Sequence, residues 1–124
     1  MIDFQNGAFV KLKLTSNADF YDWIAPAFVS GEEIILTYRS VRDGLVFTNK
    51  RIMAINVQGI TGKKRDFISL PYKNIQAFGV ESAGTMDYDS ELELWFSGIG
   101  RVKFEFIPNI NIAQICKLIS DMVL

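Results

Sequence analysis

Hydrophobic and polar residues alternate along much of the chain between residues 33 and 106, with the period of two that is typical of β-strands with one buried face. Clusters of Gly, Asn, Asp and Pro interrupt the alternation, and such clusters mark turns. The pattern predicts seven strands, over residues 34–39, 45–48, 51–57, 65–70, 75–82, 91–96 and 101–106. The fourth strand should end at Pro71, because proline cannot donate to a sheet ladder.

The last two of these strands have the clearest pattern. In 91–96 Leu and Phe alternate with Glu and Trp, and in 101–106 Val and Phe alternate with charged residues. Gly98-Ile99-Gly100 between them predicts a three-residue hairpin loop, with Gly100 in the left-handed position. We therefore expect the Leu, Val and Phe side chains of this hairpin in the core, and Trp95 on the outward face.

The period changes to 3.6 after Pro108, which predicts an amphipathic helix that docks on a sheet. The apolar stripe of this helix comprises Ile112, Ile115, Cys116, Ile119 and Val123. Asn111, with Gln114 three residues later, resembles a capping box and places the start of the helix near residue 111. On this stripe Cys116 is expected to be a buried, inert thiol.

The first 30 residues have a different pattern from the rest. Residues 17–28 carry aromatic and aliphatic side chains at helical spacing, with Asn17 as the expected cap and Pro26 as a residue that bends or ends the helix. Residues 1–14 are too apolar for a free tail, so they pack either on their own sheet or on a neighbouring subunit. We expect an extension with a short helix over 1–30 and one domain over 31–124.

Composition limits the chemistry that the chain can perform. The 124 residues are 49% hydrophobic, enough for one compact domain with its own core. Thirteen basic against fourteen acidic residues leave a net charge of −1, so no overall attraction to nucleic acid or anionic lipid is expected. The chain has no His and one Cys. It therefore lacks a His-based catalytic triad, a His-ligated or thiolate zinc site and an internal disulfide, and we expect neither a cofactor nor a metal.

Targeting signals are also absent from the sequence pattern. The amino-terminal residues lack the charged region, apolar run and cleavage site of a signal peptide, and no run of 18 apolar residues predicts a transmembrane helix. A single cysteine is consistent with a reducing compartment. We expect a cytoplasmic protein without an integral membrane segment.

Several spaced stretches point to a family. They are FTNKR (47–51), QGITGKK (58–64), LPY (70–72) and ELELW (91–95). Together with seven antiparallel strands and one closing helix, they resemble the bacterial pleckstrin-homology domain family over roughly residue 17 to the end of the chain. The resemblance implies a mainly β, strongly bent antiparallel sheet whose open end is closed by the carboxy-terminal helix. It also implies ring-like homo-oligomers, and it brings no enzyme activity or cofactor.

The densest basic run is Lys63-Lys64-Arg65, which follows Gly59 and Gly62. A phosphate loop needs four residues between its glycines, then Lys and Ser or Thr, and a helix behind it. Here two residues separate the glycines, Lys64 replaces the hydroxyl residue and a strand follows, so a turn with solvated charges is the simplest interpretation. The alternative is a patch for an anion or a protein partner. Those eukaryotic pleckstrin-homology domains that bind phosphoinositides use a basic loop between their first two strands, here 41–44, where Asp43 offsets Arg42.

The other candidate sites are apolar. Trp95 shares the outward register with glutamates, so it is either an interface anchor or covered by the amino-terminal helix. Phe4, Phe9 and Val10 are the interface candidates in the extension. The acidic run 87–93 fails the calcium-loop pattern, because the glycine and final glutamate are missing.

These observations favour a non-enzymatic binding or assembly module that forms homo-oligomers. The alternative is peripheral recognition of an anionic lipid, a phosphorylated ligand or a protein partner through the basic loop.

Overall fold

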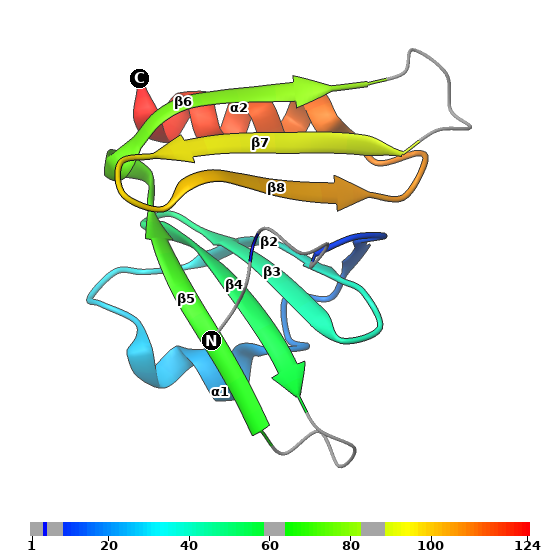
Figure 1. Cartoon of the computed structure of the whole chain (residues 1–124). Coiled ribbons are helices and arrows are strands. Elements are labelled where there is room, and N and C mark those ends of the chain that lie inside the picture. Colours follow the sequence, from blue (N-terminus) through cyan, green and yellow to red (C-terminus); the bar gives the residue numbers. More distant parts are fainter. Residues whose placement is uncertain (1–3, 5–8, 59–63, 83–88) are drawn as a thin grey trace.

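The computed structural model describes residue 4 and residues 9–58, 64–82 and 89–124. In this part of the chain the strands form two antiparallel sheets, and a helix follows them (Figure 1). The five-stranded sheet contains, in order, β1 (Lys13–Thr15), β2 (Ile34–Arg39), β3 (Asp43–Thr48), β4 (Arg51–Gln58) and β5 (Lys64–Pro71). The three-stranded sheet contains β6 (Ile75–Glu81), β7 (Ser90–Phe96) and β8 (Gly100–Phe106), and the closing helix is α2 (Ile112–Val123).

All seven expected strands are present, as β2 to β8, and the fold class is confirmed. The structure adds β1, which pairs Lys13 with Arg39 of β2 and is too short to produce a recognisable period. The β7–β8 hairpin turns as expected, with Gly98 and Gly100 at φ of 94° and 79°. In this left-handed region glycine has no steric penalty.

The two sheets separate between β5 and β6, where one continuous bent sheet was expected. Pro71 ends β5, and the short 3-10 helix η2 (Tyr72–Asn74) redirects the chain into β6. The buried Tyr72 hydroxyl donates to the carbonyl of Thr48 over 2.7 Å and fixes this corner to the β3–β4 turn. The corner therefore sets the angle at which one sheet crosses the other.

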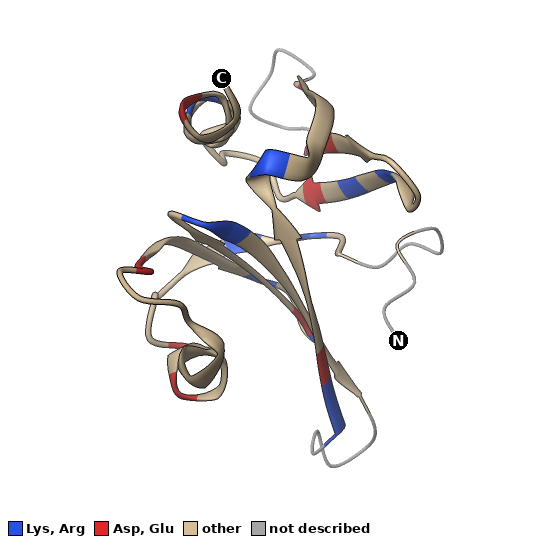
Figure 2. Cartoon of the chain, turned by 90° about the vertical axis from the view of Figure 1, so that its left-hand side faces the viewer, with Lys and Arg blue, Asp and Glu red and all other residues tan. Residues whose placement is uncertain are grey.

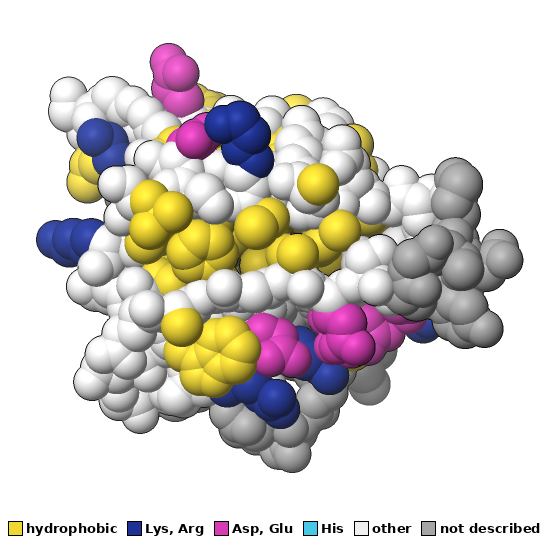
Figure 3. All heavy atoms as spheres, turned by 90° about the horizontal axis from the view of Figure 1, so that it is seen from above, with side chains coloured by type: hydrophobic (Ala, Val, Ile, Leu, Met, Phe, Trp, Pro, Cys, Tyr) yellow, Lys and Arg dark blue, Asp and Glu magenta, His cyan; other side chains and the backbone are white. Residues whose placement is uncertain are grey.

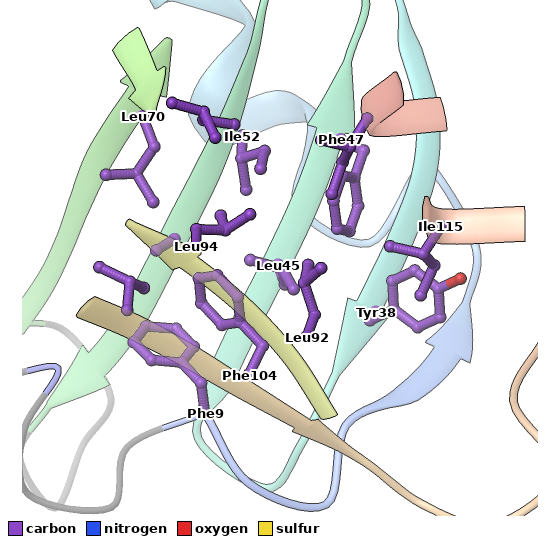
Figure 4. Packing of buried hydrophobic residues seen from close by; sticks show 14 of the residues in the cluster. Phe9, Tyr38, Leu45, Phe47, Ile52, Leu70, Leu92, Leu94, Phe104 and Ile115 are labelled. Carbon is purple, nitrogen blue, oxygen red and sulfur yellow. The ribbon is translucent and has the colours of Figure 1, made fainter. Parts of the chain in front are cut away.

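The main core lies between the sheets. Figure 4 shows Leu45, Ile52 and Phe47 of the five-stranded sheet facing Leu92, Leu94 and Phe104 of the other. The inward residues predicted for the β7–β8 hairpin are all buried. Tyr38 contacts the rings of Phe47 and Phe106 at centroid distances of 5.9 and 5.1 Å, and burial raises its pKa to about 12.

Helix α2 closes the space beside this core. The side chain of Asn111 accepts a hydrogen bond from the Gln114 N–H at 3.1 Å, so the predicted cap is confirmed. Ile115 and Ile119 are buried as expected, and Leu118 joins them although it lay outside the predicted stripe. Cys116 is half-buried, not buried, because it lies at the border of the contacting face.

The amino-terminal helix is much shorter than expected. It consists of α1 (Tyr21–Ile24) and the 3-10 turn η1 (Ala25–Ala27), which contains Pro26. Asn17 does not cap it, because its side-chain amide donates to the carbonyl of Ile35 at 3.4 Å. The expectation of one helix over 17–28 with an Asn17 cap is therefore wrong, and the chain uses most of this segment for turns.

A second, smaller apolar cluster explains the spacing in residues 17–28. Ile24 packs with Val46, Met53 and Ile55 on the outer face of β3 and β4, away from the main core. Trp23, Phe20, Phe28, Ile34 and Phe67 surround this cluster. The aromatic residues of this segment thus cover a sheet face, which requires only one helical turn.

Candidate interaction surfaces

The amino-terminal segment packs on its own domain where it is described. Leu12 N–H donates to Glu105 O and Ile107 N–H donates to Leu12 O, both at 3.0 Å. Glu105 N–H donates to Phe9 O at 2.9 Å. Residues 9–12 therefore cover the outer edge of β8, while β1 continues into the five-stranded sheet, so this segment joins the two sheets.

The three apolar candidates in this segment differ in exposure. Phe9 is fully buried, with its ring edge-on to Phe104 at 5.5 Å, and Phe4 stacks on Phe9 at 5.6 Å and is half-buried. Val10 is 38% exposed. Of the three side chains, that of Val10 is the most exposed to solvent, and that of Phe9 is part of the core.

Trp95 is half-buried on the outward face of the three-stranded sheet, between Ala77 of β6 and Arg101 of β8. Helix α1 packs on the other sheet, where Trp23 lies edge-on to Phe67 at 5.4 Å. The helix therefore does not cover Trp95. Its interface role stays a prediction.

The basic run lies at the start of β5. Lys63 falls outside the described residues, while Lys64 and Arg65 are exposed. In Figure 2 the start of β5, next to the grey trace, is coloured blue for its basic residues. The Arg65 guanidinium carbon lies 5.2 Å from the centre of the Trp23 ring, a cation–π contact that anchors the beginning of β5 to α1. This contact gives Arg65 a structural role beside any role in binding.

A hollow of about 720 Å³ lies near the edge of the five-stranded sheet that is opposite to β5. It is formed between the amino-terminal segment and the β2–β3 hairpin. Four basic residues line it: Lys11, Lys13, Arg39 and Arg42. The sequence analysis did not group them, because they come from two separate segments. The pairing of Lys13 with Arg39 in adjacent strands brings them together, and no local motif could reveal it.

Asp43, the acidic residue in the wall of this hollow, is held by structural contacts. Its carboxylate accepts the Phe9 N–H at 2.9 Å and the Asn56 side-chain amide at 2.7 Å. Lys11 pairs with Asp89 at 2.6 Å, and this hydrogen bond raises the pKa of Lys11. Arg39 pairs with Asp19 at 3.3 Å. Nearby carboxylates therefore offset part of the positive charge.

The acidic residues of the three-stranded sheet also cluster. Glu81, Glu91 and Glu93 bring carboxylate oxygens within 4.8 Å of one another on the outward face. Lys103 lies 3.2 Å from Glu91, and Arg101 lies 3.8 Å from Glu93. These two cross-strand ion pairs account for most of the cluster, so it supports no metal site by itself.

Four strands lie at the ends of the two sheets: β1, β5, β6 and β8. Residues 9–12 pair with the outer edge of β8, and β1 is only three residues long. The outer edges of β5 and β6, the strands on either side of η2, are the long edges without a strand partner within the described residues. An open edge presents unpaired N–H and C=O groups to any strand that approaches it.

These features belong to a known class of domain. Two crossed antiparallel sheets with a closing carboxy-terminal helix define a pleckstrin-homology-like fold, and the model of the bacterial PH domain family matches residues 3–123. The chain belongs to the bacterial PH domain family. The match includes most of the amino-terminal extension.

Relatives extend over nearly the whole chain. Uncharacterized protein YjqA of Bacillus subtilis (strain 168) is 39% identical over 119 residues, which cover 94% of this chain and 95% of that protein. The crystal structure of a DUF1696 family protein with a pleckstrin-homology domain from Shewanella loihica PV-4 has a TM-score of 0.80 and 38% identity, and covers 93% of this chain and 99% of the other. A pleckstrin homology domain from Shewanella amazonensis SB2B has a TM-score of 0.68 and 40% identity, with 89% and 92% covered.

Among the described residues, no helix has both the length and the apolar character needed to cross a membrane.

Proposed function

We propose that this protein is a non-enzymatic assembly module of the cytoplasm that forms homo-oligomers. Domains of this type are typically non-catalytic. The observation that carries the proposal is the open outer edge of β5. This strand pairs with β4 without a register shift from Arg51 opposite Pro71 to Gln58 opposite Lys64.

An edge of this kind favours association between chains. Eight residues at about 3.3 Å each give a straight edge of roughly 26 Å, longer than most edge strands. Natural proteins usually shorten or interrupt such an edge. Here the charges are at its start, in Lys64, Arg65 and Asp66, and the rest of β5 offers a regular template for a second strand.

Two further surfaces support the proposal. Trp95 is a half-exposed aromatic residue, and Val10 lies beside the hollow on the amino-terminal segment. Large apolar side chains with a polar surround are typical contact residues between subunits. If β5 of one copy contacts a different surface of the next, the contact is head-to-tail and closes into a ring when the rotation allows.

Sedimentation velocity at about 5 to 50 micromolar measures the solution mass against the 14.0 kDa of one chain. We expect a defined multiple of that mass, and a monomer throughout this range overturns the proposal. Hydrogen exchange locates the contact. The amides of residues 64–71 should exchange more slowly in the oligomer than in diluted protein, and unchanged exchange there rules out the β5 edge.

A second candidate function is recognition of an anionic group. The observation that favours it is the hollow lined by Lys11, Lys13, Arg39 and Arg42, with Val41 almost fully exposed on its rim. Several cations around one concave surface attract phosphate. The run of Lys63, Lys64 and Arg65 is the competing position for the same function.

Two pairs of variants separate these positions. Lys13→Glu with Arg42→Glu should abolish binding to the hollow, and Lys64→Glu with Arg65→Glu should abolish binding at the basic run. Co-sedimentation with phosphatidylserine vesicles tests a membrane source, and titration with inorganic phosphate tests a soluble one. Binding that neither pair changes excludes both positions.

A further inference from the structure

The open edge of β6 lies beside an apolar groove. Phe78 and Val80 are opposite the buried Leu94 and Leu92 of β7, so their side chains point to the inward face of the sheet. Even so, Val80 is 39% exposed and Phe78 is only half-buried. The inward face is therefore incompletely covered along this strand.

Helix α2 forms the other wall of this groove. Figure 3, which looks down on the top of the molecule as drawn in Figure 1, shows a band of apolar side chains between β6 and α2. The half-buried apolar residues of α2 are Ile112, Cys116, Met122 and Val123. In the described part of the chain, the backbone of residues 77–81 has hydrogen bonds only with β7.

The outward face of β6 has a different character. Ala77, Gly79 and Glu81 point outward, and a Cβ on Gly79 would meet nothing within 4 Å. The small residues leave room for a long side chain to cross β6 and reach the acidic cluster of Glu81, Glu91 and Glu93. Lys103 and Arg101 pair with two of these three carboxylates, so among the described residues one negative charge of the cluster has no ion-pair partner.

We propose that β6 and α2 bind an extended peptide of a partner protein, in which apolar residues alternate with Lys or Arg. The peptide adds a fourth strand to the three-stranded sheet. Its main chain pairs with β6, and its apolar side chains enter the groove, the pattern expected for strand addition. Its basic side chains lie over Gly79 and meet the acidic cluster.

Charge decides between this occupant and a second copy of the chain. A second copy joined through β6 brings no basic residue to the acidic cluster, because Glu81 is the only charged residue of β6. A peptide with basic outward residues adds cross-strand attraction to the cluster. The proposal goes beyond self-association through β5, and it uses a different edge.

The probe is a fluorescent peptide VKLKLT, the sequence of residues 10–15, which alternates apolar and basic residues. Fluorescence anisotropy should detect binding to the full chain, and the charge-reversed peptide VELELT should bind at least tenfold more weakly. Val80→Asp and Glu81→Lys should each weaken the binding of VKLKLT at least tenfold. The matched controls Val41→Asp and Glu33→Lys, at exposed positions elsewhere, should leave it unchanged.

Amide hydrogen exchange should show protection of residues 77–81 when the peptide is bound. Protection in β2 or β8 without β6 would mean that the peptide replaces the chain's own amino-terminal segment, and it overturns the proposal. No binding at millimolar peptide overturns it as well, as does binding that Val80→Asp and Glu81→Lys leave unchanged. Self-association that Val80→Asp abolishes would assign the groove to a second copy.

Discussion

Glu32 and Arg51 form a buried ion pair that joins the segment before β2 to the start of β4. Arg51 Nη2 lies 2.8 Å from Glu32 Oε1, and Nε lies 3.0 Å from Oε2. The Glu32 side chain is fully buried, and that of Arg51 is 17% exposed. Thr48 Oγ1 also donates to Oε2 at 2.7 Å, and the Val29 N–H donates to Oε1 at 3.0 Å. Both carboxylate oxygens are therefore satisfied.

Removing one charge of this pair should destabilise the fold. In Glu32→Gln the shape is kept, but the Arg51 guanidinium stays in place without its counter-charge. We expect the free energy of unfolding to fall by about 3 kcal/mol, as is typical when one partner of a buried pair is removed. Urea unfolding followed by circular dichroism measures the change.

The exposed pair of Lys117 and Asp121 on α2 provides the control. Asp121→Asn removes an ion pair that is solvated on all sides, so it should alter the free energy of unfolding by less than about 0.5 kcal/mol. Equal effects of Glu32→Gln and Asp121→Asn would contradict a stabilising role of burial at this pair.

The same carboxylate should make stability dependent on pH. Burial by itself raises the pKa of Glu32, but hydrogen bonds from Arg51, Thr48 and Val29 outweigh it, so the pKa lies below the ordinary 4.5. The unfolded state then binds the proton more tightly than the folded state. The stability that the Glu32 carboxylate contributes is therefore complete above about pH 4.5. It is lost as the pH falls through the lower pKa of the folded state. Between about pH 5 and 3, wild type should lose more stability than Glu32→Gln, and parallel curves would contradict this.

Asn111 should stabilise α2 through its cap. Asn111→Ala removes the side-chain acceptor of the Gln114 N–H and leaves the Asn111 carbonyl, at 3.2 Å, as its acceptor. We expect a loss of about 1 kcal/mol in the free energy of unfolding. Asn111→Ser should retain most of the stability, because serine also accepts a hydrogen bond at this position. If alanine and serine behave alike in thermal unfolding, the cap does not contribute.

Gly44 and Phe20 should be energetically coupled. A Cβ on Gly44 would lie 2.6 Å from two ring carbons of Phe20, so Gly44→Ala forces the ring away from β3. We expect a loss of about 1–3 kcal/mol, the range for overpacking. Phe20→Ala removes the ring and opens this space. In the Phe20→Ala background, Gly44→Ala should therefore lower the free energy of unfolding by less than it does in the wild type.

Gly79→Ala is the matched control, because nothing lies within 4 Å of the added Cβ. Its stability should stay close to that of the wild type. Strictly additive effects of Gly44→Ala and Phe20→Ala would show that the ring is not the obstacle.

Much of the architecture is readable from local patterns. Period-two alternation, apolar runs and turn residues identified β2 to β8. The outward or inward direction of each residue in the β7–β8 hairpin is correct, because one face of each of these two strands is buried. The cap at Asn111 was also predictable, since it depends on residues three positions apart. The predicted helix over 17–28 was wrong, because the apolar spacing of this segment reflects distant contacts with β3, β4 and β5. Helix propensity, which is a local property, does not describe such contacts.

The candidate surfaces were harder to predict. The sequence singled out a contiguous basic run, and the structure adds a hollow whose basic residues come from two separate segments of the chain. The division into two sheets at η2, and the groove between β6 and α2, likewise depend on segments far apart in the chain.

By itself, the sequence determined the strands, the closing helix, the family and the absence of His-based chemistry, because these follow from periodicity, spacing and composition. Only the tertiary structure decided that Phe9 lies in the core, that Glu32 meets Arg51, and that β5 and β6 keep open edges. The physical reason is that a local pattern shows which face of an element is buried, whereas the partner that buries it is set by how the two sheets cross.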